Sequence, residues 1–375
     1  MPDYKNQHYV PKFLLRQFSS DGRSVSLILL RDWKTVPVSR IKDQCAEDYF
    51  YGKDVVIEKA FGELEHKIAL LLADLSRIKL EALSPEQEFL IKLFVHYQKH
   101  RTMAAANKVD ALADAHWKKL MRETIKLNHD LSFPIDEEDL DLVNVKVTNP
   151  IHSILSIAAE SFPLIEDLEI KFLITDGPST FIFSDNPVVF YNQFIEHHPD
   201  FYHCKGLTGL AVKGLQIFLP ISPHVCVAFF DPATYSYGSR RKRVCGVSKR
   251  DVLFLNQLQA LNAHECLYFS KTLDFKEMDS LKEIRATHPS ISEPQLLSVG
   301  PSTERDDGIF SQFMSIASAD PRIGAKFTFA SVIDDSRWPN YLFEAVPHRF
   351  PDAMGLIAKY KRIYRQASKL IPPRV

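Results

Sequence analysis

The sequence predicts an α+β fold with a mainly antiparallel sheet, a layer of long helices and a small C-terminal appendage. Hydrophobic residues recur at helical spacing in residues 56–127, whereas short β-favouring runs separated by turn signals occupy residues 168–230. Beyond residue 270 the composition shifts toward proline, glycine and serine, which is typical of a linker. Strands and helices gathered in separate stretches favour an α+β arrangement over an alternating one.

The first predicted element is an extended segment that leads into a helical turn. Pro11 fixes its own φ and pushes Val10 toward extended geometry, so residues 8–10 should be β or polyproline-like. Residues 13–18 follow as an apolar run that is compatible with a helix. The segment is therefore too well specified to be a frayed terminus.

A small β layer is predicted next. Residues 24–30 form a continuous β-favouring run, and a hairpin with residues 35–38 is expected. Residues 47–52 are predicted to close this layer, with Tyr49 and Tyr51 on one face. Because so small a layer buries little by itself, we expect it to dock on the helices that follow.

Two long helical stretches come after the β layer. Residues 56–75 read as an amphipathic helix. Ser84 is a predicted N-cap, followed by proline at the first helical position and by Gln87 where a capping box needs it. Helical composition then persists over residues 85–127, either as one rod or with a break near Asn107.

The following part of the chain turns to strands. Asn149 and Pro150 open one more helix, which Pro163 ends or kinks. The Asp176–Gly177 pair predicts a hairpin turn between two strands. The strands of this part are predicted at residues 168–175, 180–184, 187–191, 215–220, 225–230 and 265–269, with a helix at 248–264.

These patterns divide the chain into three predicted regions. Residues 1–270 form the α+β domain, and residues 271–307 are a helix followed by a linker rich in proline and serine. Residues 308–375 are a small C-terminal unit with a helix near residues 353–366. A surface connection is expected at the acidic residues 133–141.

Composition limits the classes of partner. The 375 residues carry 46 basic and 47 acidic side chains, so the formal charge of -1 provides no global attraction to nucleic acid or to an anionic membrane. Five cysteines without a CxxC pair favour reduced thiols over disulfides or a structural zinc site. With no signal-like start and no apolar run of about 18 residues, we expect a soluble cytoplasmic protein without membrane contact.

Several stretches together carry a family resemblance. They are HYVPKFLLRQF, SVSLILLRD and AEDYFY near the N-terminus, SDNPVVFY at residues 184–191 and FLPISP at residues 218–223. In combination they resemble the bacterial DUF4238 family, a domain-of-unknown-function family with an N-terminal HYVP signature. The resemblance extends over residues 4–270. It implies where the important residues lie and implies no activity.

His8 is the first candidate catalytic residue. It stands beside Tyr9, with Arg16 about two helical turns further on. A histidine there could act as a general base near neutral pH, and the guanidinium could hold a phosphate or a carboxylate. Alternatively, His8 bonds a backbone carbonyl and Arg16 pairs with a carboxylate, so that the segment only fastens the N-terminus.

Asp185 and Asn186 form the second candidate cluster. They follow a strand, where open sheets often place site residues, and Asp185 could orient His8 or bind a metal ion. The alternative is an Asx turn, in which both side chains cap their own backbone before a proline. Gln98 and Arg101, on the long helix, are candidates for polar contacts with the N-terminal segment.

No metal site is predicted, and no cofactor is identified. His96 and His100 have the i, i+4 spacing that aims two imidazoles at one zinc ion, but HYQKH lacks the glutamate of the metalloprotease helix. No third ligand is recognisable. A partly buried helix face explains the two histidines equally well.

The chain contains one dense basic run. It follows Tyr235 and Tyr237 and consists of Arg240, Arg241, Lys242 and Arg243. Contacts of this run with phosphates, with the tyrosines stacking on bases, would give a local nucleic-acid contact. The alternative is an exposed loop without a partner.

Two functions follow from these candidates. The leading hypothesis is a hydrolase acting on a phosphodiester or other phosphate-containing substrate, including nucleic acid, with His8 and Asp185 as catalytic residues. Substrate contacts are assigned to the polar residues of the same stretches, namely Tyr9, Arg16, Gln98, Arg101 and Asn186. The alternative is a non-catalytic ligand- or partner-binding module in which these residues are structural.

Overall fold

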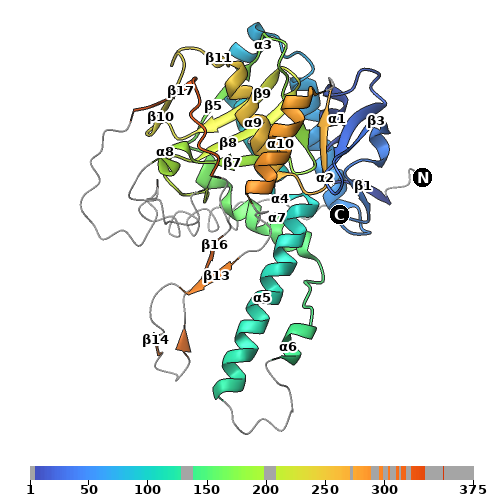
Figure 1. Ribbon diagram of the computed structural model, residues 1–375, viewed down its shortest axis with the longest axis vertical. Coiled ribbons are helices and arrows are strands. Elements are labelled where there is room, and N and C mark those ends of the chain that lie inside the picture. Colours follow the sequence, from blue (N-terminus) through green and yellow to red (C-terminus); the bar gives the residue numbers. More distant parts are fainter. Residues whose placement is uncertain are drawn as a thin grey trace, which may run out of the picture.

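The computed structural model describes residues 5–127, 138–197, 208–270, 273–288, 295–298, 303–304, 310–311, 314–317, 322–333 and 349. Helices and mostly antiparallel sheets form a body from which one long helix extends (Figure 1). The predicted α+β class is confirmed.

A five-stranded sheet forms the centre of the body. Its strands, in spatial order, are β11 (Val244–Gly246), β5 (Glu169–Ile174), β9 (Val225–Phe230), β8 (Gln216–Ser222) and β7 (Val189–Tyr191). β11 and β5 run parallel, whereas the other neighbours are antiparallel. Every residue of β8 and β9 is buried, because protein covers both faces of the sheet.

Helices cover one face of this sheet. They are α1 (Lys12–Gln17), α2 (Val56–Leu71), α3 (Arg77–Glu81), α4 (Pro85–His100) and the short η2 (Phe162–Ile165). α7 (Pro150–Ser161), which precedes η2 in the chain, packs against α4 and shares a separate buried cluster with Phe61 of α2. Leu14, Ile68 and Phe94 share a buried cluster with Ile170 and Phe172 of β5. The prediction of a helical layer on the sheet is therefore confirmed for this face.

The opposite face is covered by one helix and by a late segment of the chain. α9 (Lys249–Asn262) and residues 322–333 pack there, and Phe327 and Phe329 share a buried cluster with Phe218 of β8. Figure 1 shows α9 lying across the sheet. The short helix α8 (Gln193–Glu196) follows β7 at the same side. The sheet is thus the middle of three layers.

A second sheet flanks the first. Its order is β3 (Lys34–Arg40), β2 (Ser24–Leu29), β12 (Cys266–Phe269) and β6 (Phe183–Ser184). α10 (Phe275–Thr287) packs beside α9, and its Leu281 is buried with Ile28 and Leu267. Among the described residues, four smaller strand pairs are also present. They are β1 (Asn6–His8) with β4 (Ala46–Asp48), β10 (Tyr235–Tyr237) with β17 (Ala330–Val332), β13 (Gln295–Ser298) with β16 (Met314–Ala317), and β14 (Thr303–Glu304) with β15 (Phe310–Ser311).

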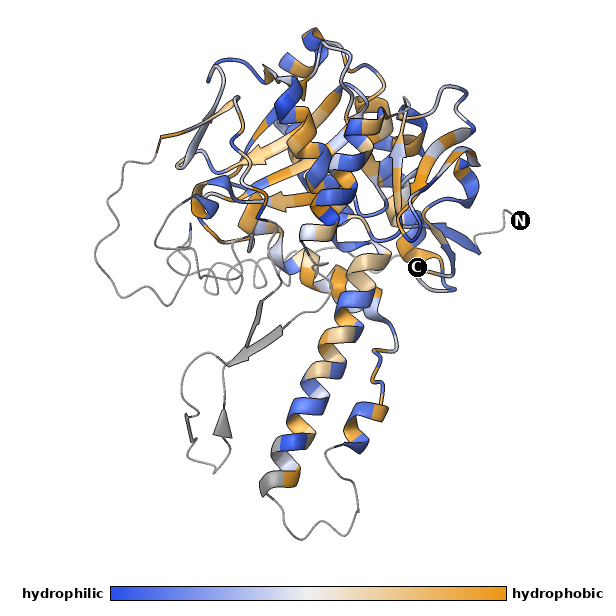
Figure 2. Ribbon diagram, in the orientation of Figure 1, coloured by the Kyte–Doolittle hydropathy of each residue, from blue (hydrophilic) through white to orange (hydrophobic). Residues whose placement is uncertain are grey.

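One helix leaves the body. α5 (Met103–Leu127) extends away from it, and α6 (Asp139–Leu142) lies alongside (Figure 1). The returning chain is held by Asp114 and Asp110, which accept hydrogen bonds from the backbone N–H groups of Val145 (2.8 Å) and Val147 (3.0 Å). Hydrophilic and hydrophobic residues alternate along α5, whereas the strands of the body are mostly hydrophobic (Figure 2).

The predicted helical turn is confirmed, whereas the strand before it lies at residues 6–8 and overlaps the predicted extended segment, residues 8–10, only at His8. The chain enters as β1 and continues as α1, with Pro11 at ψ 138° before the first helical residue. The hairpin of β2 and β3 forms as expected, and a short 3₁₀ turn, η1 (Ile41–Asp43), follows it. The capping box of α4 is present: Ser84 accepts from the N–H of Gln87 (3.3 Å), and the Gln87 side chain accepts from the N–H of Ser84 (2.9 Å).

The predicted hairpin at Asp176–Gly177 is wrong. β5 pairs with β9 and β11, whereas β6 belongs to the other sheet and pairs with β12. Asn256 of α9 explains the crossing, because its side chain accepts from the N–H of Ile182 and donates to the carbonyl of Thr180, both at 2.9 Å. These bonds draw the second segment toward α9 and away from β5.

The predicted strand at residues 47–52 is also wrong in part. β4 ends at Asp48 and pairs with β1 instead of the β2–β3 hairpin. Tyr49 has a φ of 56° and is 40% exposed, whereas Tyr51 is buried. The side chain of Gln7 causes the turn, since it accepts from the N–H of Tyr51 (2.6 Å) and donates to the carbonyl of Gly52 (2.9 Å).

The long helical stretch breaks earlier than expected. α4 ends at His100 and α5 begins at Met103, so the break lies at Arg101 and Thr102 instead of near Asn107. The Thr102 hydroxyl accepts from the N–H of Ala105 (3.2 Å), which caps the new helix.

No helix in the described ranges is both long and apolar enough to cross a membrane.

The predicted three-region division stays a prediction. The helix expected near residues 353–366 and most of the acidic connection at 133–141 lie outside the described residues. Most of the predicted linker lies outside them too. From the C-terminal unit, residues 322–333 pack onto the central sheet, so this segment contributes to the core of the α+β body.

Candidate functional site

The N-terminal strand presents consecutive side chains to opposite sides. β1 pairs with β4 with His8 opposite Ala46, and the N–H of Tyr9 continues the pairing to the carbonyl of Cys45 (2.9 Å). Because successive residues of an extended chain alternate in direction, His8 and Tyr9 face different surroundings. The buried Val10 then anchors the start of α1.

His8 faces η1. Burial lowers its pKa from 6.5 to about 4, and the positive charges of Lys12 and Arg16 act in the same direction, against the backbone carbonyls of Ile41 and Lys42. Its Nε2 atom has no hydrogen-bond partner among the described residues. Arg16 itself is exposed. His8 is therefore a neutral imidazole near pH 7.

The backbone of Tyr9 is bonded to the end of α4. Its carbonyl accepts from Gln98 Nε2 (3.0 Å), and Gln98 Oε1 accepts from Arg101 Nε (2.9 Å). Arg101 is 1% exposed and pairs with Glu65 of α2 at 2.6 Å, with its guanidinium 4.5 Å from the ring centre of Phe61. These contacts join the N-terminal segment to two helices.

Asp185 is held by backbone amides. Its carboxylate accepts from the N–H groups of His264 (2.8 Å), Glu265 (2.6 Å) and Cys266 (3.0 Å). Burial raises the pKa of this carboxyl, although the three amide bonds act in the opposite direction. The side chain thereby fixes the turn between α9 and β12.

Asn186 connects the same turn to the α4–α5 break. Its Oδ1 accepts from Thr102 Oγ1 (3.2 Å), and its Nδ2 donates to the carbonyl of Asn262 (2.9 Å). Lys99, one turn earlier on α4, donates to the carbonyl of Val188 (3.0 Å). The end of α4 and Thr102, in the break after it, are thus fastened to Val188 and to Asn186.

The structure brings some predicted site residues together and separates others. Tyr9, Gln98 and Arg101 form one hydrogen-bonded chain. The charge of Asp185 acts on the phenol of Tyr9, where it adds to the effect of burial in raising the pKa. His8, by contrast, makes no hydrogen bond with Asp185 within the described residues. The catalytic roles of His8 and Asp185 stay predictions.

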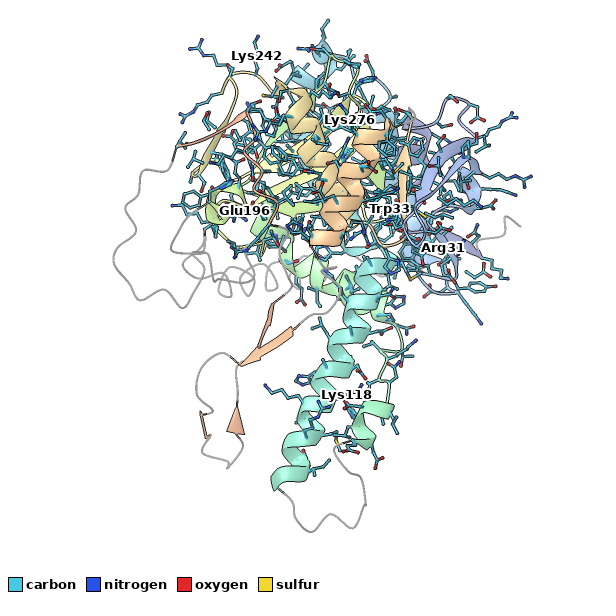
Figure 3. The ribbon with its side chains drawn as sticks, viewed as in Figure 1. Arg31, Trp33, Lys118, Glu196, Lys242 and Lys276 are labelled. Carbon is cyan, nitrogen blue, oxygen red and sulfur yellow. The ribbon has the colours of Figure 1, made fainter. Side chains whose placement is uncertain are left out.

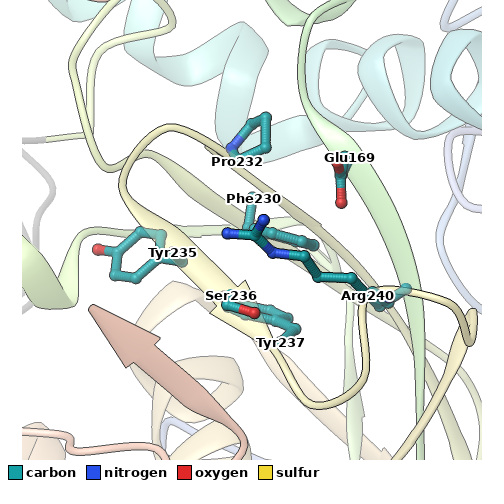
Figure 4. A pocket seen from close by; sticks show the side chains of 8 residues that line it. Glu169, Phe230, Pro232, Tyr235, Ser236, Tyr237 and Arg240 are labelled. Carbon is teal, nitrogen blue, oxygen red and sulfur yellow. The ribbon is translucent and has the colours of Figure 1, made fainter. Parts of the chain in front are cut away.

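A separate hollow lies where β5 begins and β9 ends (Figure 4). We call it the β5 pocket. Its volume is about 170 Å³, and it is lined by Glu169, Lys171, Phe230, Pro232, Tyr235, Ser236, Tyr237 and Arg240. Of the residues singled out from the sequence, Tyr235, Tyr237 and Arg240 line it, whereas those of the N-terminal segment do not.

The alternation of side chains along β5 explains why Glu169 and Lys171 both lie at this pocket. Ile170 and Phe172 of β5 point into the helix-covered core, so Glu169, Lys171 and Leu173 point to the other face. Leu173 is buried there in an apolar cluster, and Lys171 is 4% exposed. The two charged residues therefore take positions at the edge of a core that is otherwise apolar.

Lys171 is tied to the loop after β10. Its Nζ donates to the carbonyl of Ser239 (2.9 Å) and to that of Lys242. An ammonium has three donors, so one N–H has no partner among the described residues. No carboxylate in the described ranges lies within ion-pair distance. Burial lowers the pKa of Lys171, against the charges of Glu169 and Glu81.

Both tyrosines of the basic run are core residues. Tyr237 stacks on Phe230 with ring centres 4.0 Å apart, and the hydroxyl of Tyr235 donates to the carbonyl of Gly214 (3.0 Å). Both rings are 1% exposed, so neither offers a free face for a base. The predicted nucleic-acid contact included stacking of these two tyrosines on bases, and their buried rings offer no surface for such stacking.

The four basic residues of the run differ in their surroundings. Arg243 pairs with Glu88 of α4, and its backbone N–H donates to Glu81 (2.7 Å). Arg240, Arg241 and Lys242 are exposed, and Lys242 projects outward at the edge of the body (Figure 3). Of these, Arg240 alone lines the β5 pocket.

Comparison with known proteins places the chain in a family. A family model described as protein of unknown function (DUF4238) matches residues 6–272. The chain belongs to the DUF4238 family. No curated protein and no solved structure matches it. The matched region of the family contains every candidate site residue and every residue that lines the β5 pocket, whereas residues 322–333 lie beyond it.

The β5 pocket of this family member can hold a charged group. Lys171 and Arg240 are cations on its walls, and Ser236 adds a hydroxyl.

The histidine pair on α4 bonds backbone carbonyls. The His96 ring contacts the carbonyl of Ala158 at 2.8 Å, and the His100 ring contacts the carbonyl of His96 at 2.7 Å. Within the ranges that the structure describes, no three side chains of His, Cys, Asp or Glu are grouped to hold a metal ion.

Sequence reasoning missed Glu169, Lys171 and Ser236. A signal was present in residues 168–175, because charges at alternate positions of an otherwise apolar strand lie on one face. Charged side chains in a buried strand need a partner or solvent. That pattern marks the edge of the sheet where the pocket opens.

Proposed function

We propose that the protein is a non-catalytic module that binds a small anionic ligand in the β5 pocket. The observation that carries the proposal is Lys171, a buried ammonium on the pocket wall without a carboxylate partner among the described residues. A buried cation is costly unless it is paired, and an anionic ligand would pair with it. Arg240 adds an exposed guanidinium suited to bidentate contact with carboxylate or phosphate.

The contacts of the predicted catalytic residues support a structural role for them. Asp185 accepts from three backbone N–H groups and Arg101 is occupied by Glu65 and Gln98. Removing Asp185 would leave three backbone N–H groups without this acceptor, and removing Arg101 would leave the buried Gln98 without one of its partners. A buried group that loses its hydrogen bond costs about 1–3 kcal/mol. These side chains then serve to hold the N-terminal segment, the end of α4 and the turn at Asp185 in place.

Titration calorimetry with inorganic phosphate and with acetate tests the binding function. Arg240→Met should weaken binding about tenfold or more, because the charge-assisted hydrogen bonds of the guanidinium are lost. Arg241→Met is the matched control, since Arg241 is exposed on the same loop and does not line the pocket. Equal affinity of both variants, or no heat with either anion at tens of millimolar, would contradict the proposal.

Hydrolysis of a phosphodiester is the second candidate function. Its support is His8, whose low pKa keeps the imidazole neutral and whose Nε2 has no partner among the described residues. A nitrophenyl phosphodiester and single-stranded nucleic acid serve as test substrates. If turnover disappears in both His8→Asn and Asp185→Asn while thermal stability is kept, the hydrolase is supported and the non-catalytic module is wrong.

A further inference from the structure

The β5 pocket carries charges of both signs. Glu169 stands on β5 at one side, while Arg240 reaches from the loop after β10 toward Phe230 (Figure 4). The two do not form an ion pair within the described residues, although both line the same pocket. The Glu169 carboxylate is exposed and makes no hydrogen bond or ion pair with any described residue. It is therefore available to a ligand.

We infer that the ligand of the β5 pocket is a small zwitterion, an α-amino acid or a close analogue, whose anionic group meets Arg240 and Lys171 and whose ammonium meets Glu169. This inference rests on the proposed function. A ligand with one group of each sign neutralises the walls on both sides. A ligand with a second negative group in place of the ammonium would place that group against Glu169. The Glu169 carboxylate therefore selects against polyanions.

The size and lining of the pocket point to the same class. Its volume of about 170 Å³ is below the roughly 300–1,000 Å³ of pockets that hold drug-sized ligands. Phe230 and Pro232 supply an apolar wall, which suits a short hydrocarbon side chain. Nucleic acid is disfavoured, because the tyrosine rings behind the pocket are buried and successive phosphates would approach Glu169.

The backbone around the pocket supports a fixed arrangement of these charges. Lys171 bonds the carbonyls of Ser239 and Lys242, which holds the loop that carries Arg240. On the other side of the loop, Glu81 accepts from the N–H groups of Arg243 (2.7 Å) and Val244 (3.1 Å). The fold therefore fixes the backbone positions from which Arg240 and Glu169 reach a ligand, which favours recognition of a zwitterion.

Calorimetry with matched ligands tests the inference. The protein amino acids are first ranked by thermal shift, and the strongest is compared with its deamino analogue, a plain carboxylate, and its decarboxy analogue, a plain amine. In the unmodified protein the amino acid should bind about tenfold or more tightly than the carboxylate, and the amine should not bind.

Two variants separate the inference from the proposed function. Glu169→Gln should remove the preference for the amino acid and leave the carboxylate bound, whereas Glu283→Gln, an exposed acid on α10, should change neither. An unchanged preference in Glu169→Gln, or equal binding of amino acid and carboxylate by the unmodified protein, overturns the zwitterion while the anion site stands. If Arg240→Met keeps full affinity for both the amino acid and the carboxylate, the anion site itself is overturned.

Discussion

Buried histidines are one group of residues through which pH acts on this fold. His8, His96 and His100 have pKa values lowered to about 4, 3 and 4, chiefly by burial. In the unfolded chain they titrate near 6.5. As the pH falls below that value, the unfolded chain binds protons that the folded chain does not, so stability decreases between about pH 6.5 and pH 4.

Replacing His8 by asparagine should remove its share of this acid sensitivity. The asparagine amide can donate to the carbonyls of Ile41 and Lys42 without titrating. From the pKa of about 4, the unmodified protein should lose about 2 kcal/mol through His8 between pH 7 and pH 5. Urea denaturation of His8→Asn at the two pH values should show a pH effect smaller by that amount.

The exposed His66 provides the control for this experiment. His66→Asn should leave the difference in stability between the two pH values unchanged. If His8→Asn behaves like His66→Asn, then His8 does not titrate as a buried group, and its described surroundings are contradicted.

The importance of individual polar residues was partly predictable, but their partners were not. Asp185 precedes an asparagine and a proline, so local rules predict bonds to its own backbone. Its partners are instead the N–H groups of His264, Glu265 and Cys266, far along the chain. Such a contact depends on the path of α9 and β12, which no local pattern encodes.

At the scale of elements, start signals were the most informative part of the sequence. The capping box at Ser84 was predicted from the residue types alone and is present in the structure. Strand partners were less predictable, because pairing depends on distant segments. β4 and β6 were expected beside their neighbours in sequence, and each pairs elsewhere.

The cap of α4 offers a measurable test at this scale. Ser84→Ala removes the acceptor for the N–H of Gln87 and should cost about 1 kcal/mol of unfolding free energy. Ser76→Ala is the matched control, since Ser76 is the N-cap of α3 and its side chain makes no capping bond. A chemical denaturation curve for each variant measures the difference, and equal losses would refute a special role for the capping box.

At the scale of the molecule, residues 322–333 join the C-terminal part of the chain to the central sheet. Phe327 is 3% exposed, stacks on Phe329 with ring centres 4.9 Å apart, and receives an edge contact from Tyr191. Its N–H donates to the side chain of Gln193 (3.1 Å). The linker composition before this segment favoured a separate unit, and composition cannot show that the chain returns to the sheet.

We therefore expect residues 322–333 and the family region to unfold in one transition. Phe327→Ala should destabilise the protein by about 3–5 kcal/mol and keep a single transition, because it opens a cavity on the sheet. Val332→Ala, at a position that is 47% exposed, should cost far less. Two resolved transitions in denaturation, with only one shifted by Phe327→Ala, would show instead that the segment unfolds on its own.

The bonds of Lys171 and Glu81 to the loop after β10 also have a kinetic consequence. A loop fastened from both sides has few conformations left to lose when a ligand arrives, so no slow rearrangement should precede or follow binding. In rapid mixing, the observed rate should rise linearly with ligand concentration, without a plateau. Loosening the loop by Glu81→Gln should introduce such a plateau, which would turn a one-step encounter into a gated one.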